Sequence, residues 1–241
     1  HEQILFYGIL CHSIARQFGL EEKRATVLTA AALTANLALV PVADQLNASN
    51  TVLTDDQRAV IRKHPARSIQ ALTSAGINNK LLLRIIAQHH EQADGSGYPE
   101  GLSGSDILPE AEILALAERY VAMITKRAYR NRMNITEARK LIATLADGKF
   151  RPAIPRSLLQ ILGDHPPGML VRLVNNEVGV VTRRADRTRG PFVKAIFGPR
   201  GNRYSGTFER DTSLLEYNIR APEEPEIMPT MDFSMLWGFR S

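Results

Sequence analysis

Apolar residues recur three or four positions apart along the first part of the chain, which is the spacing of an amphipathic helix. The pattern predicts one helix from Ile4 to Phe18 and a second from Glu21 to Leu39, ended by Pro41. These segments lie in a longer series of helical patterns. The sequence therefore predicts a mainly α fold built around a helical bundle.

Helix-start signals further along the chain support this prediction. Thr54 and Gln57 form a capping-box pattern, and Asn79 can cap a helix that runs to Glu91. The segment Asp94–Gly104 has four glycines and one proline in 11 residues, which indicates a loop. Further helices are predicted from Pro109 to about Ile124, from Thr136 to Ala146 and from Ser157 to Leu162.

The pattern changes near Pro152–Pro155. Short apolar runs at Met169–Val174 and Glu177–Thr182 are joined by Asn175-Asn176, which is typical of a β-hairpin. Residues 192–197 could form a third strand. We therefore expect a helical domain over residues 1–155, a short helix plus β-hairpin appendage over 156–205, and an irregular tail over 206–241. Because the chain begins with histidine and not methionine, we expect it to be an excised part of a longer protein.

The composition is that of an ordinary globular protein, with 44% hydrophobic and 23% charged residues. A single cysteine, Cys11, excludes an internal disulfide and a cysteine-rich zinc module. The net charge is +5, and the segment Arg183–Arg210 alone holds eight basic and two acidic residues. A basic segment with interspersed aromatic residues can bind nucleic acid, and this stays open as a minor alternative to a solvated face.

One stretch, Ala25–Ala43, has no charged residue and nearly the length of a membrane span. It consists mostly of alanine and is interrupted by threonines, Asn36 and Pro41. A buried helix is the preferred interpretation. No basic-then-apolar leader precedes it, so we expect no membrane insertion and a cytoplasmic location.

Three of the six histidines are candidate metal ligands. His89 and His90 are adjacent at the end of a predicted helix, and His64 lies 25 residues earlier. Adjacent residues on a helix point about 100° apart, so both can reach one centre only near the helix end. Neutral imidazole is the commonest protein ligand of metals, although a histidine on its own is more often structural.

The run from His89 to Pro99, His-His-Glu-Gln-Ala-Asp-Gly-Ser-Gly-Tyr-Pro, resembles the signature of the HD-GYP domains. His64-Pro65, the run that follows the loop to Ala117, and Arg127-Ala128-Tyr129-Arg130 also match that family's pattern. The resemblance implies an HD-type helical bundle. In that bacterial family the bundle hydrolyses cyclic di-GMP at a centre of two or three metal ions.

The resemblance also implies roles for particular residues. Arg127 and Arg130 match basic residues that face the phosphates of cyclic di-GMP, and the loop of the signature can dock diguanylate cyclase domains. Tyr98 is expected at the rim, where it can stack on a base or on a partner. Implied metal ligands are His64, His89, His90 and Glu118, and the loop residues of the signature are Asp94, Gly95, Gly97, Tyr98 and Pro99.

The chain departs from the family where the name-giving His-Asp pair would stand. The corresponding stretch, Ala31–Leu39, offers only the neutral oxygens of Thr34 and Asn36. We therefore expect at most one divalent transition metal, Mn, Fe, Ni or Zn. The main expectation is a degenerate signalling module that binds cyclic di-GMP, a related nucleotide or a protein partner with little hydrolysis. The alternative is a metal-dependent cyclic di-GMP phosphodiesterase with a reduced metal site.

Overall fold

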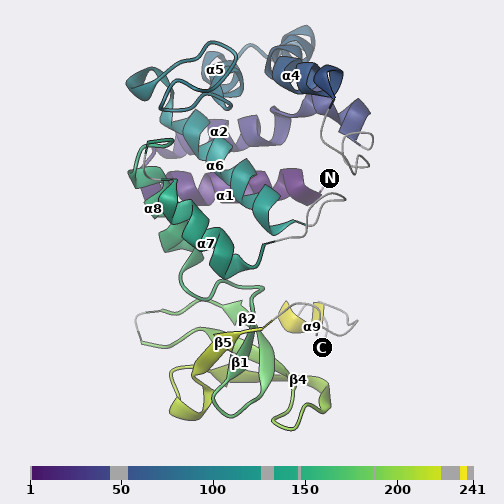
Figure 1. The fold of residues 1–241 in the computed structure, drawn as a ribbon, viewed down its shortest axis with the longest axis vertical. Helices are drawn as coiled ribbons and strands as arrows, with labels where there is room; N and C mark the ends of the chain where they lie inside the picture. The colour runs from purple at the N-terminus through teal and green to yellow at the C-terminus, as the bar shows by residue number, and fades with distance from the viewer. Residues whose placement is uncertain are drawn as a thin grey trace. The chain divides into compact units, whose positions relative to one another are not determined.

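The computed structural model describes residues 2–43, 54–125, 133–145, 148–186, 188–223 and 234–237. These fall into two compact units, residues 1–161 and 162–241. The first unit is helical and the second is a small β unit (Figure 1). The predicted class, mainly α with a small C-terminal β part, is therefore confirmed.

The helical unit is a bundle in which α1 packs against α2 and α6, and α5 packs against α2 and α4 (Figure 1). Its core is built from large aliphatic side chains that are fully buried, among them Ile14, Leu28, Ile85 and Leu114. The helices are α1 (Glu2–Phe18), α2 (Glu22–Thr34), α4 (Asp55–Ser74), α5 (Lys80–Gln88), α6 (Pro109–Ile124), α7 (Ile135–Thr144) and α8 (Ala153–Leu162), with 3-10 turns η1 (Leu37–Val42) and η2 (Gly104–Asp106).

Two predicted helix starts are confirmed in detail. Thr54 and Gln57 exchange both bonds of a capping box at the start of α4, and the Asn79 side chain accepts the Leu82 amide at the start of α5. These bonds satisfy amide groups that the first turn of a helix leaves without partners. The starts of the two helices that lead to the histidines are thus fixed by local sequence.

The predicted helix Glu21–Leu39 is wrong in its last five residues, 35–39. It ends at Thr34, and the chain continues as η1, which contains Pro41. Tertiary contacts hold this segment out of the helix. The Asn36 side chain donates to Glu118 of α6, and the Ala38 amide donates to the Ser68 hydroxyl of α4.

The segment 22–42 has the length and hydropathy of a membrane span, but both measures also fit a core helix. Here α2 contributes buried residues such as Ala25 and Leu28 to the bundle. It packs against α1, α5 and α6.

The second unit is a five-stranded antiparallel sheet with strand order β4-β3-β2-β1-β5. The predicted hairpin is present, with Asn176 in the left-handed region at its turn (φ 69°). The strands are β1 (Leu170–Leu173), β2 (Val178–Arg183), β3 (Phe192–Phe197), β4 (Arg203–Asp211) and β5 (Ile219–Pro222). The 3-10 turn η3 (Leu215–Tyr217) lies between β4 and β5, and the short helix α9 (Ser234–Trp237) follows β5 along the chain.

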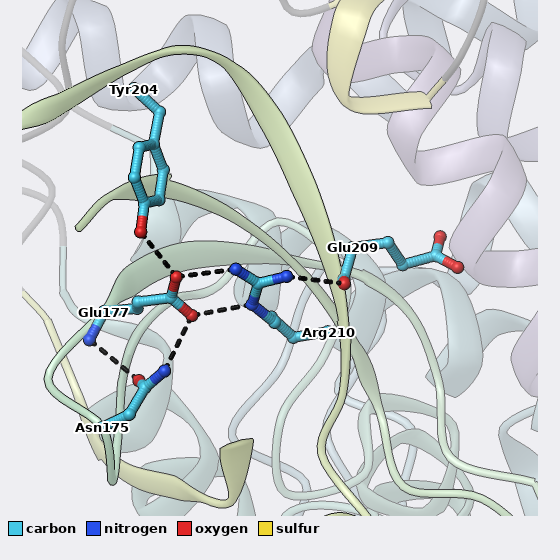
Figure 2. Close-up of polar contacts among 5 residues, drawn as sticks. All are labelled: Asn175, Glu177, Tyr204, Glu209 and Arg210. Carbon is cyan, nitrogen blue, oxygen red and sulfur yellow. Dashed lines mark hydrogen bonds and ion pairs between the residues drawn. The ribbon is translucent and has the colours of Figure 1, made fainter. Parts of the chain in front are cut away.

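The structure places β5 and most of β4 in residues for which the sequence predicts an irregular tail. A partly buried ion pair explains part of this difference. The Glu177 carboxylate receives two hydrogen bonds from Arg210 of β4, both at 2.8 Å, and one each from Tyr204 and Asn175 (Figure 2). Arg210 lies 33 residues from Glu177 along the chain, so the pair leaves no local signal in the sequence.

Candidate metal centre

Three imidazoles from two elements converge at one point of the helical unit. His64 lies within α4, whereas His89 caps the end of α5 and His90 follows it. One ring nitrogen from each lies within 4.8 Å of the others. His64 and His89 are almost fully buried, at 1% and 0% exposure, and His90 is partly exposed. The three histidines that the sequence singles out are therefore adjacent in space.

Hydrogen bonds fix which nitrogen of each buried imidazole faces the cluster. His64 Nδ1 lies 2.6 Å from the Ile61 carbonyl oxygen, and His89 Nδ1 lies 2.7 Å from that of Ile86. A carbonyl oxygen only accepts, so each Nδ1 must be the protonated nitrogen of its ring. In a neutral imidazole, Nε2 then presents a lone pair. Metal-ligating histidines usually carry such a second hydrogen bond.

The two Nε2 atoms of His64 and His89 face each other at 3.2 Å. Two lone pairs at this separation repel, and a shared cation removes the repulsion. The separation is less than twice the usual metal–imidazole distance of about 2.0–2.1 Å, so one ion can reach both atoms. The donor set of three imidazoles beside a carboxylate suits a borderline divalent transition metal. The residues present therefore fit the implied ion.

Burial keeps the cluster uncharged. It lowers the pKa of both His64 and His89 to about 4, and the pKa of His90 also lies well below its ordinary value because of burial and the neighbouring rings. The imidazoles are therefore neutral at pH 7, which is the form that binds metals.

Glu118 brings a carboxylate to the edge of the cluster from α6. Its Oε2 lies 3.9 Å from His89 Nε2, and its Oε1 accepts a hydrogen bond from the Asn36 amide. Burial raises the pKa of Glu118 to about 7, against the opposing effects of Asn36 and His64. The structure thus places Asn36, from the stretch that lacks the His-Asp pair, directly beside the candidate carboxylate ligand.

The loop after the histidines is held by Glu91, a residue that the sequence analysis missed. Its buried carboxylate accepts the amides of Glu100 at 2.7 Å and Leu102 at 2.9 Å. A Cβ atom at Gly97 would lie 2.4 Å from the Cα atom of Glu91, so only glycine fits there. The signal in the sequence is the acid that directly follows the histidine pair and precedes a glycine-rich loop.

The other loop residues differ in what they contact. The exposed Asp94 accepts hydrogen bonds from the amide and the hydroxyl of Ser96, and Gly95 has a positive φ of 78°. Tyr98, before Pro99, stacks on the His90 ring with centroids 4.7 Å apart. Asp94 therefore shapes the loop, whereas Tyr98 reaches the histidine cluster.

Two groups of predicted residues lie elsewhere. Arg127 and Arg130 fall outside the described residues. The basic segment Arg183–Arg210 belongs to the β unit, where Arg183 pairs with Glu209 at 2.8 Å and Arg210 pairs with Glu177. Part of its positive charge is thus neutralised within the unit.

Comparison with known proteins agrees with this geometry. Residues 7–154 match the HD domain family. A cyclic di-GMP phosphodiesterase of Pseudomonas aeruginosa is 30% identical over 78% of this chain and 45% of its own length. A cyclic di-GMP phosphodiesterase response regulator of Xanthomonas campestris is 29% identical over 61% of this chain and 39% of its own length. The chain thus spans less than half of each relative.

A solved structure, an HDG"Y"P protein from Bdellovibrio bacteriovorus, shares the fold with a TM-score of 0.55. It is 24% identical, and the match covers 66% of this chain and 51% of that one. The family match covers most of the helical unit and includes the three histidines and the loop that follows them. The chain therefore belongs to the HD domain family.

Proposed function

We propose that the chain is a metal-dependent phosphodiesterase of the cyclic di-GMP class with a reduced metal site. The observation that carries this proposal is the pair of backbone-tied imidazoles whose Nε2 atoms face each other at 3.2 Å. The similar proteins named as cyclic di-GMP phosphodiesterases favour a hydrolytic role over the binding-only role that the sequence led us to expect first.

In this proposal His64, His89 and His90 hold one divalent ion, and Glu118 supplies the fourth ligand. Such an ion would polarise a phosphoryl oxygen and activate water for attack on the diester. Asn36 orients the Glu118 carboxylate through its hydrogen bond to Oε1, which leaves Oε2 directed at the histidines. Tyr98 stacks on His90, so the loop that follows the histidines contacts the proposed metal ligands directly.

The number of ions is a separate part of the proposal. Among the described residues, one cluster of histidine, cysteine or acidic side chains has the spacing of a metal site. The stretch Ala25–Ala43 contributes no carboxylate that could bridge two ions. We expect one ion per chain by elemental analysis after purification with Mn²⁺ or Fe²⁺. Two or more tightly held ions would contradict the reduced site.

The activity test uses the full chain, Mn²⁺ and cyclic di-GMP, with products followed by chromatography. We expect the linear dinucleotide or GMP to form over several turnovers, and His89→Ala to lower the rate at least 100-fold because it removes a ligand. His12→Ala, a change of the same kind on α1 outside the cluster, is the matched control and should retain activity. Calorimetric binding without product would instead support the degenerate signalling role.

If the chain neither binds nor hydrolyses cyclic di-GMP, both nucleotide roles fail. The loop that contains Tyr98 would then be examined as a docking surface, with diguanylate cyclase domains as the first partners in a pull-down. Salt-sensitive binding to unrelated DNA would support the nucleic-acid alternative for residues 183–210.

A further inference from the structure

Arg62 is a cation at the edge of the histidine cluster that neither the family signature nor the proposed metal site uses. It lies on α4, two residues before His64, and its guanidinium carbon lies 5.0 Å from the centre of the Tyr98 ring. That ring stacks on His90 at a centroid distance of 4.7 Å and an interplanar angle of 21°. Arg62, Tyr98 and His90 thus form one stack that leads from the metal ligands toward solvent.

The stack fixes Arg62 from two directions. α4 places it on the same helix as His64, and the Tyr98 ring provides a surface against which a planar guanidinium packs. Tyr98 is itself held in place, because its amide donates to the His90 carbonyl oxygen at 3.2 Å and Glu91 anchors the next part of the loop. The position of the cation therefore depends on the same elements that build the cluster.

Among the described residues, no acidic side chain forms an ion pair with Arg62. Within the described residues, the ion pairs on α4 include that of Arg58 with Asp55, but none for Arg62. The side chain is exposed. An exposed guanidinium that packs over a ring still has N–H groups available for an outside acceptor. The acceptor that matches this fork is the pair of non-bridging oxygens of a phosphate group.

We propose that Arg62 is a substrate-binding residue that takes a phosphodiester of the dinucleotide at the mouth of the metal site. This inference rests on the proposed function and adds a residue that determines affinity. A cyclic dinucleotide carries two diester groups, so one can face the histidines while Arg62 holds the other. Arg62 acts in binding, whereas the histidine cluster acts in chemistry.

The test compares Arg62→Gln with Arg67→Gln, a matched removal of an exposed arginine from the same helix. With Mn²⁺-loaded protein and cyclic di-GMP, Arg62→Gln should raise KM about 10- to 100-fold, the range expected for a lost charge-assisted hydrogen bond. kcat and bound metal per chain should change less than threefold. Arg62→Lys keeps the charge but loses the forked pair of N–H donors, so its KM should lie between those of wild type and Arg62→Gln. The KM of Arg67→Gln should match that of wild type.

The outcomes separate this inference from the proposed function. If wild type turns over the substrate but Arg62→Gln keeps the wild-type KM, or loses metal in parallel, the assignment of Arg62 is wrong and the function stands. If wild type binds without turnover, calorimetric Kd values replace KM, and an unchanged Kd for Arg62→Gln overturns the assignment. If wild type neither binds nor hydrolyses cyclic di-GMP, the proposed function fails and this assignment fails with it.

Discussion

Asn36 and Glu118 share a hydrogen bond where the three imidazoles converge. An amide at position 36 can donate to the carboxylate, so the pair is stable without a cation. An aspartate there would instead place two carboxylates together, and like charges at that distance cannot both remain ionised without a cation. The residue at this position therefore determines how strongly folding of the site depends on metal.

We predict that Asn36→Asp makes the protein more dependent on metal. Without metal, the free energy of unfolding should fall by about 1–3 kcal/mol, because a charged group loses its partner. With saturating Mn²⁺, the increase in melting temperature should be larger than for wild type, since the added carboxylate binds the ion. Thermal unfolding with and without Mn²⁺ measures both effects.

Asn79→Asp is the control for this prediction, because the same change at the cap of α5 preserves a capping side chain. It should leave the Mn²⁺-dependent shift unchanged. An equal shift for Asn36→Asp and wild type would show that residue 36 does not face the ion.

The loop between α5 and α6 is the element that connects the histidines to the rim. Glu91 holds it through two amides, and Gly97 crosses directly over the Glu91 backbone. Rim residue Tyr98 therefore cannot move independently of His90. A change in the packing of the loop should therefore also disturb the histidine cluster.

We predict that Gly97→Ala destabilises the helical unit by about 1–3 kcal/mol, because the added methyl group would overlap backbone atoms. Chemical denaturation followed by circular dichroism measures the change in the free energy of unfolding. Gly206→Ala on β4, where nothing lies within 4 Å of the added atom, is the matched control and should differ little from wild type. A Gly97→Ala variant of wild-type stability would mean that the loop adjusts freely.

The elements that the sequence predicted best are those with local signals. The capping box at Thr54, the cap at Asn79 and the hairpin turn at Asn175-Asn176 each depend on residues within four positions, and all three are confirmed. The break after Thr34 was missed because Asn36 bonds to a residue 82 positions away. The three histidines were found through their grouping and resemblance. Glu91 and Arg62 were not, since their contacts depend on how the loop folds.

At the scale of the whole molecule, the chain forms two compact units with separate sources of stability. The β unit has a small apolar cluster of Leu170, Val178, Val180, Ile196 and Leu236. It also contains the partly buried pair of Glu177 and Arg210 (Figure 2). Hydrogen bonds from Arg210 lower the pKa of Glu177 to about 2. The stability of the β unit should therefore depend on the protonation state of Glu177, and so on pH.

We predict an acid-sensitive contribution from Glu177. Its pKa is lowered on folding, so the stabilisation is fully present above about pH 4.5, the ordinary pKa of the group, and is lost as the pH falls toward 2. At pH 3 the loss should be about 2 kcal/mol. Hydrogen exchange of the β2 and β4 amides in the full chain at pH 5 and pH 3 measures it.

Glu177→Gln provides the comparison, because glutamine does not titrate. The variant should be less stable at pH 7 but should show a shallower loss between pH 5 and pH 3. Parallel losses in the two proteins would assign the acid sensitivity to other carboxyl groups, such as Asp186 and Asp211.

The bonds from His64 and His89 to the Ile61 and Ile86 carbonyl oxygens have a consequence for metal exchange. The orientation of both rings is set by the helices that carry them, so the entropy of ordering these ligands is lost during folding and not when the ion binds. Chelation should then leave the helix content nearly unchanged, in contrast to zinc fingers, which unfold without their ion. A site prepared in this way can release one divalent ion and accept another while the protein stays folded.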